Sequence, residues 1–456
     1  MRIISDRQRS LAFYQSPPSV TQEWSMIASI LEANPAVNKR VWEDLTGSRH
    51  GGLKQPAGAK GMTAEQVLRF AIVKMKEQLS YRDLRDRVAD SIALRAFCLM
   101  GPEEIPAFTT LQENIKRIGP ETWEAVNRII IEYACAKGVE NGRRVRIDTT
   151  GVETNIHHPT DSHQLWDSVR VIARILQRVE TDITRLRGRF HDHRRAAKKA
   201  FFRIHNTRGQ DQKKLLYKKL IHMAKRTVAY GRQALAELTR QRCASFEEEL
   251  VAAHYGAQLD QFLPLAEGVI NQSRRRVLLG EEVPAQEKVL SIFEPHTDII
   301  KKGQREIIYG HKVLFTGGKS NLILDSVIER GNPADAARFI PALGRQKEQY
   351  GHMPEQVATD AGFASKPNAR EALARGVKDL VFVAPQHKSL PELIKGTRAY
   401  KQLRKWRAGI EGIISAGKRA FGLDRCTWSG FESFKAYVQL AVLAFNLQTL
   451  ARHFLA

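Results

Sequence analysis

The spacing of apolar residues predicts helices between about residues 60 and 140. Thr63 and Gln66 match the T-x-x-Q capping box, and an apolar face with helical period begins at Val67. Ser80 is expected to begin a second helix whose apolar stripe reaches Ile92, and Thr109 a third. Another helical period follows Pro120 and ends at Ala136. Arginine and lysine side chains on these short helices suit DNA docking of the helix-turn-helix kind, although a plain helical domain with a solvated basic face fits the pattern equally.

Two heptad seams predict a helical hairpin in the middle of the chain. The first runs from Leu165 to Leu186 and the second from Leu216 to Tyr230, with a turn expected at residues 205–209. We interpret both seams as core packing. Between Arg185 and Arg226, fifteen Lys or Arg residues stand against two Asp residues. Such a segment would neutralise many DNA phosphates, and a solvated coiled-coil face is the alternative interpretation.

Near residue 290 the apolar period changes from helical to alternating. We expect a β-hairpin over 307–328, a helix from a cap at 331–335 to Tyr350, and a short strand that ends at Asp360. The remaining expected elements are a turn at 361–365, a helix at 368–375, a strand at 379–385, a helix at 406–421 and a last helix after Phe431.

A short strand before this region ends in a carboxylate. In the stretch RRVRIDTTGVETNIHHPTD, from Arg143 to Asp161, Val145 and Ile147 alternate with polar residues up to Asp148. The pattern predicts a strand with one buried face. An aspartate in this place is often only a turn residue, so its meaning depends on partners elsewhere in the chain.

Composition and charge favour a folded protein that binds a polyanion. The chain has 456 residues, is 43% hydrophobic and carries 72 Lys or Arg against 49 Asp or Glu, a formal net charge of +23. So large an excess makes nucleic acid the first expected partner. The four cysteines, including Cys243, form no C-x-x-C pair, which argues against a zinc ribbon or a disulfide framework. A glycine-containing loop is expected at 47–61, and we expect neither a signal peptide nor a membrane span.

The order of the expected elements is that of a ribonuclease H-like α/β domain interrupted by a long helical insertion. In such a sheet the ends of the strands with Asp148 and Asp360 lie side by side, and the helix with Glu411 crosses them. Carboxylate oxygens are the ligands that Mg²⁺ and Mn²⁺ prefer, so a two-metal site for phosphodiester chemistry is expected. Arg407 and Lys418 fall on the same helical stripe as Glu411 and could hold phosphate, although an Arg and a Glu four residues apart also form ordinary surface ion pairs.

The chain resembles bacterial insertion-sequence transposases of the DDE type, closest to the ISNCY-like group. The resemblance rests on IDTTGVETNIHHPTD around Asp148, REIIYGHKV and IERGNPAD, ATDAGFAS around Asp360, and RAGIEGIISAGKRAFGLDRC around Glu411. The last stretch matches an R-x3-E-x6-K core, with Arg404 in place of a usual tyrosine. The region MTAEQVLRFAIVKMKEQLSYRDLRDRV is similar to the family's N-terminal DNA-binding part.

The resemblance implies three regions and one activity. A helical DNA-binding domain is expected at 1–140, a catalytic domain at 141–158 and 286–456, and a basic helical insertion at 159–285. The implied activity is Mg²⁺- or Mn²⁺-dependent cleavage and strand transfer at terminal inverted repeats, on double-stranded DNA, by a cytoplasmic, nucleoid-associated dimer or higher assembly. Asp148, Asp360 and Glu411 would bind the metals, Arg407 and Lys418 the phosphates, with Glu153, Asp161, His157 and His158 as supporting or structural residues. A structure-specific nuclease or resolvase and a non-catalytic DNA-binding regulator are the alternatives.

Overall fold

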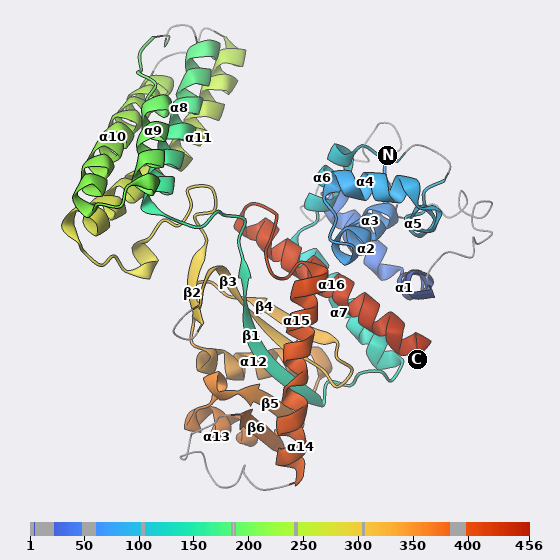
Figure 1. The fold of residues 1–456 in the computed structure, drawn as a ribbon. Helices are drawn as coiled ribbons and strands as arrows, with labels where there is room; N and C mark the ends of the chain where they lie inside the picture. Colours follow the sequence, from blue (N-terminus) through green and yellow to red (C-terminus); the bar gives the residue numbers. More distant parts are fainter. Residues whose placement is uncertain are drawn as a thin grey trace. The chain divides into compact units, whose positions relative to one another are not determined.

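The chain folds into two compact units, residues 1–154 with 310–456 and residues 155–309. The computed structural model describes residue 4 and residues 22–47, 61–101, 105–183, 186, 188–240, 245–302, 306–383 and 398–456 (Figure 1). Most of the loop expected at 47–61, and Cys243, lie outside these residues.

A mixed sheet forms the centre of the first unit. Its strands are β1 (Arg144–Glu153), β3 (Glu306–Gly317), β4 (Ile323–Ile328), β5 (Gln356–Asp360) and β6 (Asp379–Val383). The sheet order is β2-β3-β1-β5-β6, with β2 at Asp298–Lys302 and with β4 also paired to β3. β1 runs parallel to β5 and antiparallel to β3. The strands that carry Asp148 and Asp360 are therefore neighbours, as predicted.

Helices cover both faces of this sheet. The helices are α12 (Asp335–Tyr350), α13 (Lys366–Ala374), α14 (Arg398–Arg407) and α15 (Gly409–Phe421). Phe382 of β6 packs against Phe339 of α12, whereas Val381 shares an apolar cluster with Leu403 of α14. Because successive strand residues point to opposite faces, α12 and α14 lie on opposite sides of the sheet. The single helix expected at 406–421 is wrong, since the chain leaves α14 at Arg407 and begins α15 at Gly409.

β1 is longer and more buried than predicted. It continues past Asp148 to Glu153, because its second half pairs with β3 from Asp148↔Phe315 to Glu153↔Gly310. Val145 and Ile147 are buried as expected, but Arg146 and Asp148 are only 2% and 8% exposed. Contact between β1 and α15 covers the face that the sequence pattern assigned to solvent.

The last helix, α16 (Phe431–Leu455), is the centre of packing for the rest of the first unit. It packs against α1, α3, α7 and β4, and nearly all of its first twenty residues are buried or half-buried. Its buried amides are satisfied: the Asn446 side chain accepts from Ile323 N and donates to Ile323 O, both at 2.8 Å. The Gln439 side chain accepts from the Ser326 hydroxyl group at 2.9 Å and donates to Ser326 O at 3.2 Å. In the part of the chain that is described, none of the helices combines the length and apolar character needed to cross a bilayer.

The N-terminal helices follow the predicted caps with two exceptions. They are α1 (Gln22–Glu32), α2 (Ala36–Thr46), α3 (Ala64–Lys76), α4 (Tyr81–Asp90), α5 (Ile92–Phe97), α6 (Phe108–Lys116) and α7 (Pro120–Ala136). The Thr63 capping box and the Ser80 cap are confirmed. The Thr109 cap is wrong, since α6 begins after Ala107 without a side-chain cap. Ile92 is 56% exposed, because Ser91 caps a new helix and ends the stripe of α4.

The second unit is a helical bundle. It contains α8 (Asp161–Asp182), α9 (Arg194–Asn206), α10 (Gln210–Arg240), α11 (Phe246–Ser273), a π-helical turn (Arg274–Leu279) and a 3₁₀ turn (Ala285–Glu287). The predicted seams are confirmed as core, with Leu165 and Leu220 fully buried. The simple hairpin is wrong, because α8 packs against α9, α10 and also α11. Pro264 lies inside α11, where a proline usually indicates a helix end.

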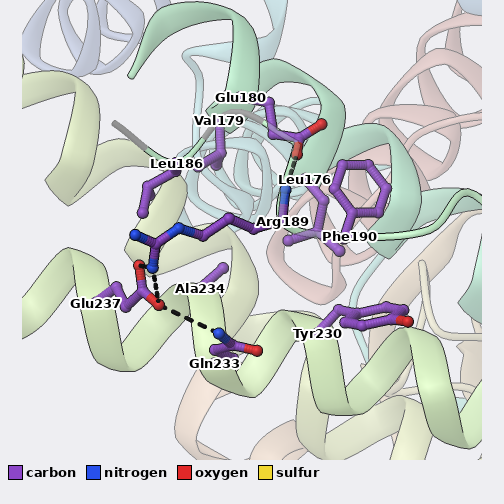
Figure 2. A pocket seen from close by; sticks show the side chains of 10 residues that line it. All are labelled: Leu176, Val179, Glu180, Leu186, Arg189, Phe190, Tyr230, Gln233, Ala234 and Glu237. Atoms are coloured by element: carbon purple, nitrogen blue, oxygen red, sulfur yellow. Dashed lines mark hydrogen bonds and ion pairs between the residues drawn. The ribbon is translucent and has the colours of Figure 1, made fainter. Parts of the chain in front are cut away.

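A small cavity lies in this bundle between α8 and α10 (Figure 2). Its volume of about 20 Å³ suffices for one water molecule. Arg189 closes one side, with its Nη1 atom 2.7 Å from both carboxylate oxygens of Glu237 and its backbone N–H donating to Glu180. The cationic group at this cavity is thus already neutralised by a carboxylate.

Candidate active site

The pairing of β1 with β5 places two aspartates at adjacent positions of the sheet. The parallel register joins Ile147 to Thr359, and Asp148 and Asp360 are the next residues of the two strands. One oxygen of each is held by the backbone: Asp148 Oδ1 accepts from Thr149 N at 2.8 Å and Asp360 Oδ1 from Gly362 N at 3.0 Å. The other oxygen of each carboxylate, Oδ2, contacts Arg407.

Arg407 draws the three predicted carboxylates together. Its Nη2 atom lies 2.9 Å from Asp148 Oδ2 and 3.9 Å from Asp360 Oδ2. Its Nη1 atom lies 2.5 Å from Glu411 Oε1. The Arg407 side chain is 13% exposed, whereas that of Glu411 is 64% exposed. Residues 148, 360 and 411 thus converge on one guanidinium group, although they are far apart in sequence.

Arg146 fixes the break between α14 and α15 that allows this arrangement. Its Nη1 atom donates to Trp406 O at 2.9 Å, and its guanidinium lies 4.6 Å from the centre of the Trp406 ring. A Cβ atom on Gly409 would lie 2.0 Å from Arg146 Nη1, so any larger residue here would displace the guanidinium group. Burial, with a smaller effect of Arg144, lowers the Arg146 pKa to about 10. Arg146 is therefore a structural support for the segment that carries Arg407 and Glu411.

A fourth carboxylate, Asp335, lies beside the predicted set. As the first residue of α12, it accepts hydrogen bonds from Thr149 Oγ1 at 3.2 Å and from Lys312 Nζ at 3.1 Å. A Cβ atom on Gly362 would be 2.9 Å from Asp335 Oδ2 and 3.2 Å from Asp360 Oδ1, which places both carboxylates at the same glycine. The sequence interpretation missed Asp335 because GNPAD was assigned only to the helix start. A signal for Asp335 was present in the sequence, since it is an acidic residue at the start of a helix and ends the IERGNPAD motif.

The charges around Asp360 oppose one another. Burial raises its pKa, Arg407 lowers it, and the negative charge of Asp335 raises it again. The net shift is upward, so the carboxylate is harder to ionise than an ordinary aspartate unless another cation joins the site.

The remaining predicted residues make contacts of their own. Lys418 is two turns along α15 from Glu411, pairs with Asp424 at 3.5 Å, and contacts neither Asp148 nor Asp360. Glu153 pairs through its backbone with Asp424 and Cys426. In the second unit, Asp161 accepts from Arg276 at 2.9 Å, His157 Nε2 lies 3.4 Å from Asp167 Oδ2, and the His158 ring packs on Tyr309. These contacts hold elements of the fold together.

The chemistry of the donor set fits a hard divalent cation, but its present geometry does not. Asp148, Asp360 and Glu411 supply carboxylate oxygens, which Mg²⁺ and Mn²⁺ prefer. Within the described ranges, no three His, Cys, Asp or Glu side chains are arranged to hold a metal ion. The positive charge at the centre of the carboxylates belongs to Arg407, so a metal would have to replace this guanidinium as their shared partner.

Two parts of the chain match known protein families. Residues 290–447 match the "Transposase DDE domain" family, and residues 32–117 match the "Transposase domain (DUF772)" family. Curated proteins and solved structures give no significant match. A mixed sheet that gathers acidic side chains on adjacent strands, together with these matches, defines an enzyme of DNA transposition. The two matches indicate a DDE transposase of an insertion sequence.

Proposed function

We propose that this transposase cleaves DNA at the terminal inverted repeats of an insertion sequence and joins the freed ends to target DNA, using Mg²⁺ or Mn²⁺. The observation that supports the proposal most directly is the convergence of Asp148, Asp360 and Glu411 on Arg407. The strand order of the sheet, with a parallel β1–β5 pair and an antiparallel β1–β3 pair, supports a ribonuclease H-like catalytic domain.

Asp148, Asp360 and Glu411 are the proposed metal ligands. Divalent ions bound there would activate the attacking water or 3′-hydroxyl group and stabilise the leaving oxygen. Backbone hydrogen bonds to the Oδ1 atoms of Asp148 and Asp360 fix both carboxylates with Oδ2 toward the site. Glu411 is largely exposed, so it can change rotamer to complete a ligand set without disturbing the core.

Arg407 and Lys418 are the proposed phosphate contacts. In the arrangement described, Arg407 keeps three negative charges together that would otherwise repel one another. Once cations occupy the carboxylates, the guanidinium is free to bind a DNA phosphate, for which its planar fork is suited. Lys418, which pairs with Asp424 two turns further along α15 than Glu411, is the second proposed contact. Double-stranded DNA is the proposed partner, bound by a dimer or higher assembly in the cytoplasm.

The test is cleavage by Asp360→Asn. This change keeps the size of the side chain and removes a charged metal ligand, so supercoiled DNA carrying the element's ends should be bound but not nicked in Mg²⁺ or Mn²⁺. Asp86→Asn is the matched control, because Asp86 is exposed and pairs with neighbouring Arg85. Normal nicking by Asp360→Asn would refute the site assignment.

A second measurement separates transposition from other nuclease activities. The unaltered chain should join pre-cut element ends to a target plasmid in a metal-dependent reaction. Cleavage of branched DNA without such joining would indicate a structure-specific nuclease instead. DNA binding without either reaction would indicate a regulator.

A further inference from the structure

A large cavity in the first unit lies next to the active-site helix. Its volume is about 650 Å³, and its walls come from α3, α4, α6, α15, the 422–428 segment and α16. This volume is in the range of ligand pockets and is large enough for a nucleotide. Neither the metal chemistry nor the family matches assign it a role.

The walls of the cavity are cationic and aromatic together. Lys74 Nζ lies 4.9 Å from the centre of the Tyr81 ring, and Lys116 Nζ lies 5.9 Å from that of Trp428. Lys418 and Arg425 also line the cavity, together with two carboxylates, Asp83 and Asp424. Asp424 pairs with Lys418 at 3.5 Å, which leaves Lys74 and Lys116 as the lysines available for an anion. Lysines beside aromatic rings are the combination that holds single-stranded nucleic acid, since the cations bind phosphate and the rings pack against bases.

Two buried polar atoms in these walls lack a hydrogen-bond partner among the residues described. They are the Tyr81 hydroxyl oxygen and Trp428 Nε1, and Trp428 as a whole is 2% exposed. Most buried donors in folded proteins are paired, so an unpaired donor at a cavity wall is a candidate contact for a ligand.

Lys74 adds a buried positive charge without a carboxylate beside it. Its side chain is 5% exposed, and the described residues within ion-pair distance include no acidic group. Its ammonium group donates to Leu79 O at 3.0 Å. Burial, together with repulsion from Lys116, lowers its pKa to about 8. An anionic ligand would relieve both effects.

The cavity and the carboxylates share helix α15, and β1 pairs with one wall segment of the cavity. Lys418 follows Glu411 by seven residues, so the two lie on the same face of α15 and about 10 Å apart along its axis. That length corresponds to about three stacked nucleotides. At the far end of β1, Glu153 pairs with Asp424 and Cys426 of the cavity's 422–428 wall.

We propose that this cavity binds an unpaired nucleotide of the DNA strand that is being processed, a few nucleotides from the cut. The phosphate would contact Lys116 and Lys74, and the base would meet the hydroxyl group of Tyr81 and the indole N–H of Trp428. A base must leave the duplex to enter a protein cavity, so the cavity selects DNA with an unpaired end. The inference rests on the proposed function for the position of the cut, but the binding step itself requires no metal.

The test compares blunt duplex DNA with a duplex carrying a five-nucleotide single-stranded overhang, both without divalent metal. The full chain should bind the overhang duplex more tightly, and 2-aminopurine within the overhang should lose fluorescence on binding, because aromatic rings packed against the base quench it. Lys116→Ala and Tyr81→Phe should each lose about tenfold in affinity for the overhang duplex and little for the blunt one. Both changes are mild, because Lys116 is exposed and phenylalanine keeps the ring of Tyr81.

Arg117→Ala is the matched control, since Arg117 is the neighbouring exposed cation and does not line the cavity. It should affect blunt and overhang duplexes equally. An equal fall in affinity for both duplexes with Lys116→Ala would overturn the proposal, because Lys116 would then be an ordinary backbone contact. A second outcome would also overturn the proposal. If deoxyadenosine monophosphate bound the protein and the overhang duplex did not displace it, the cavity would be a site for free nucleotides. Failure of this test leaves metal-dependent nicking intact, so it is distinct from failure of the proposed function.

Discussion

Positive charge has opposite surroundings in the two units of this protein. In the first, the guanidinium of Arg407 is mostly buried and is shared by three carboxylates. In the second, α9 and α10 expose Lys199, Arg203, Lys218 and Lys219 around a groove of about 510 Å³ with Leu216 and Met223 in its lining. Over the described ranges, none of these four cations has a carboxylate within ion-pair distance.

The two kinds of surroundings suit two different roles. Arg407 is placed to act in the reaction, whereas the exposed cations of the second unit are placed to attract DNA. A buried guanidinium among carboxylates depends on geometry, and removing it leaves negative charges that repel one another at short range. Exposed lysines act through their summed field, release counterions when they meet phosphate, and respond strongly to salt. We therefore expect mutations in the first region to affect reaction steps and those in the second to affect affinity.

The largest effect should come from Arg407→Ala. Strand cleavage should fall by about a hundredfold to a thousandfold, because the transition state loses a positioned cation, while DNA affinity changes only a few-fold. Calorimetry should show Mn²⁺ binding that is no weaker, since a competing cation has been removed. Arg404→Ala, on the exposed side of α14, is the control. If DNA affinity fell by as large a factor as strand cleavage, Arg407 would act in DNA binding, as the exposed cations do, and the prediction would be wrong.

A smaller effect is expected from replacing Lys199, Arg203, Lys218 and Lys219 together by glutamine. DNA affinity should fall by roughly tenfold to a hundredfold at moderate salt, and the salt dependence of log K should flatten by about 0.9 for each phosphate that the variant no longer neutralises. Titrations at several salt concentrations measure both quantities. Arg232→Gln, which removes a cation already paired with Glu267, should leave the slope unchanged. An unchanged slope in the fourfold variant would favour the solvated-face interpretation.

The smallest effect concerns the support of the active site. Gly409→Ala should lower the free energy of unfolding by about 1–3 kcal/mol, because the new Cβ atom would overlap Arg146. Gly412→Ala, three residues further along α15 with open space at its Cβ position, should be neutral or slightly stabilising. Chemical denaturation of both variants gives the comparison. Equal stability would mean that Arg146 can move aside at little cost.

The sequence allowed prediction of elements whose signal is local. The Thr63 cap, the strand that ends at Asp360 and the seam from Leu165 are fixed by residues within a few positions of one another, and each is confirmed. The break at Ala408 was missed because it depends on Arg146, more than 250 residues away. Asp335 was missed for the same reason, since its partners Thr149 and Lys312 lie on two other strands.

The sequence predicted the carboxylate set and, as an alternative, an ion pair between Arg407 and Glu411, but not the contacts of Arg407 with Asp148 and Asp360. Helical and strand periods reveal the order of elements along the chain, and the likeness of that order to a ribonuclease H-like domain predicted the proximity of Asp148 and Asp360, which the β1–β5 pairing confirms. Whether Arg407 contacts Glu411 only or all three acids depends on the direction of its side chain at the break between α14 and α15. The apolar period of the sequence does not determine that direction. The roles of these residues in metal and phosphate binding stay predictions until the variants are measured.

The rung Glu153↔Gly310 has one more consequence, which concerns how such a chain can change over evolution. Those two residues are paired neighbours on β1 and β3, and the entire second unit is encoded between them. A short turn could close the same rung, since joining ends that already touch costs little chain entropy. A different insert could therefore replace the bundle between these two residues while every strand keeps its register. Recombination between related elements could alter DNA affinity in this way and leave the catalytic residues untouched.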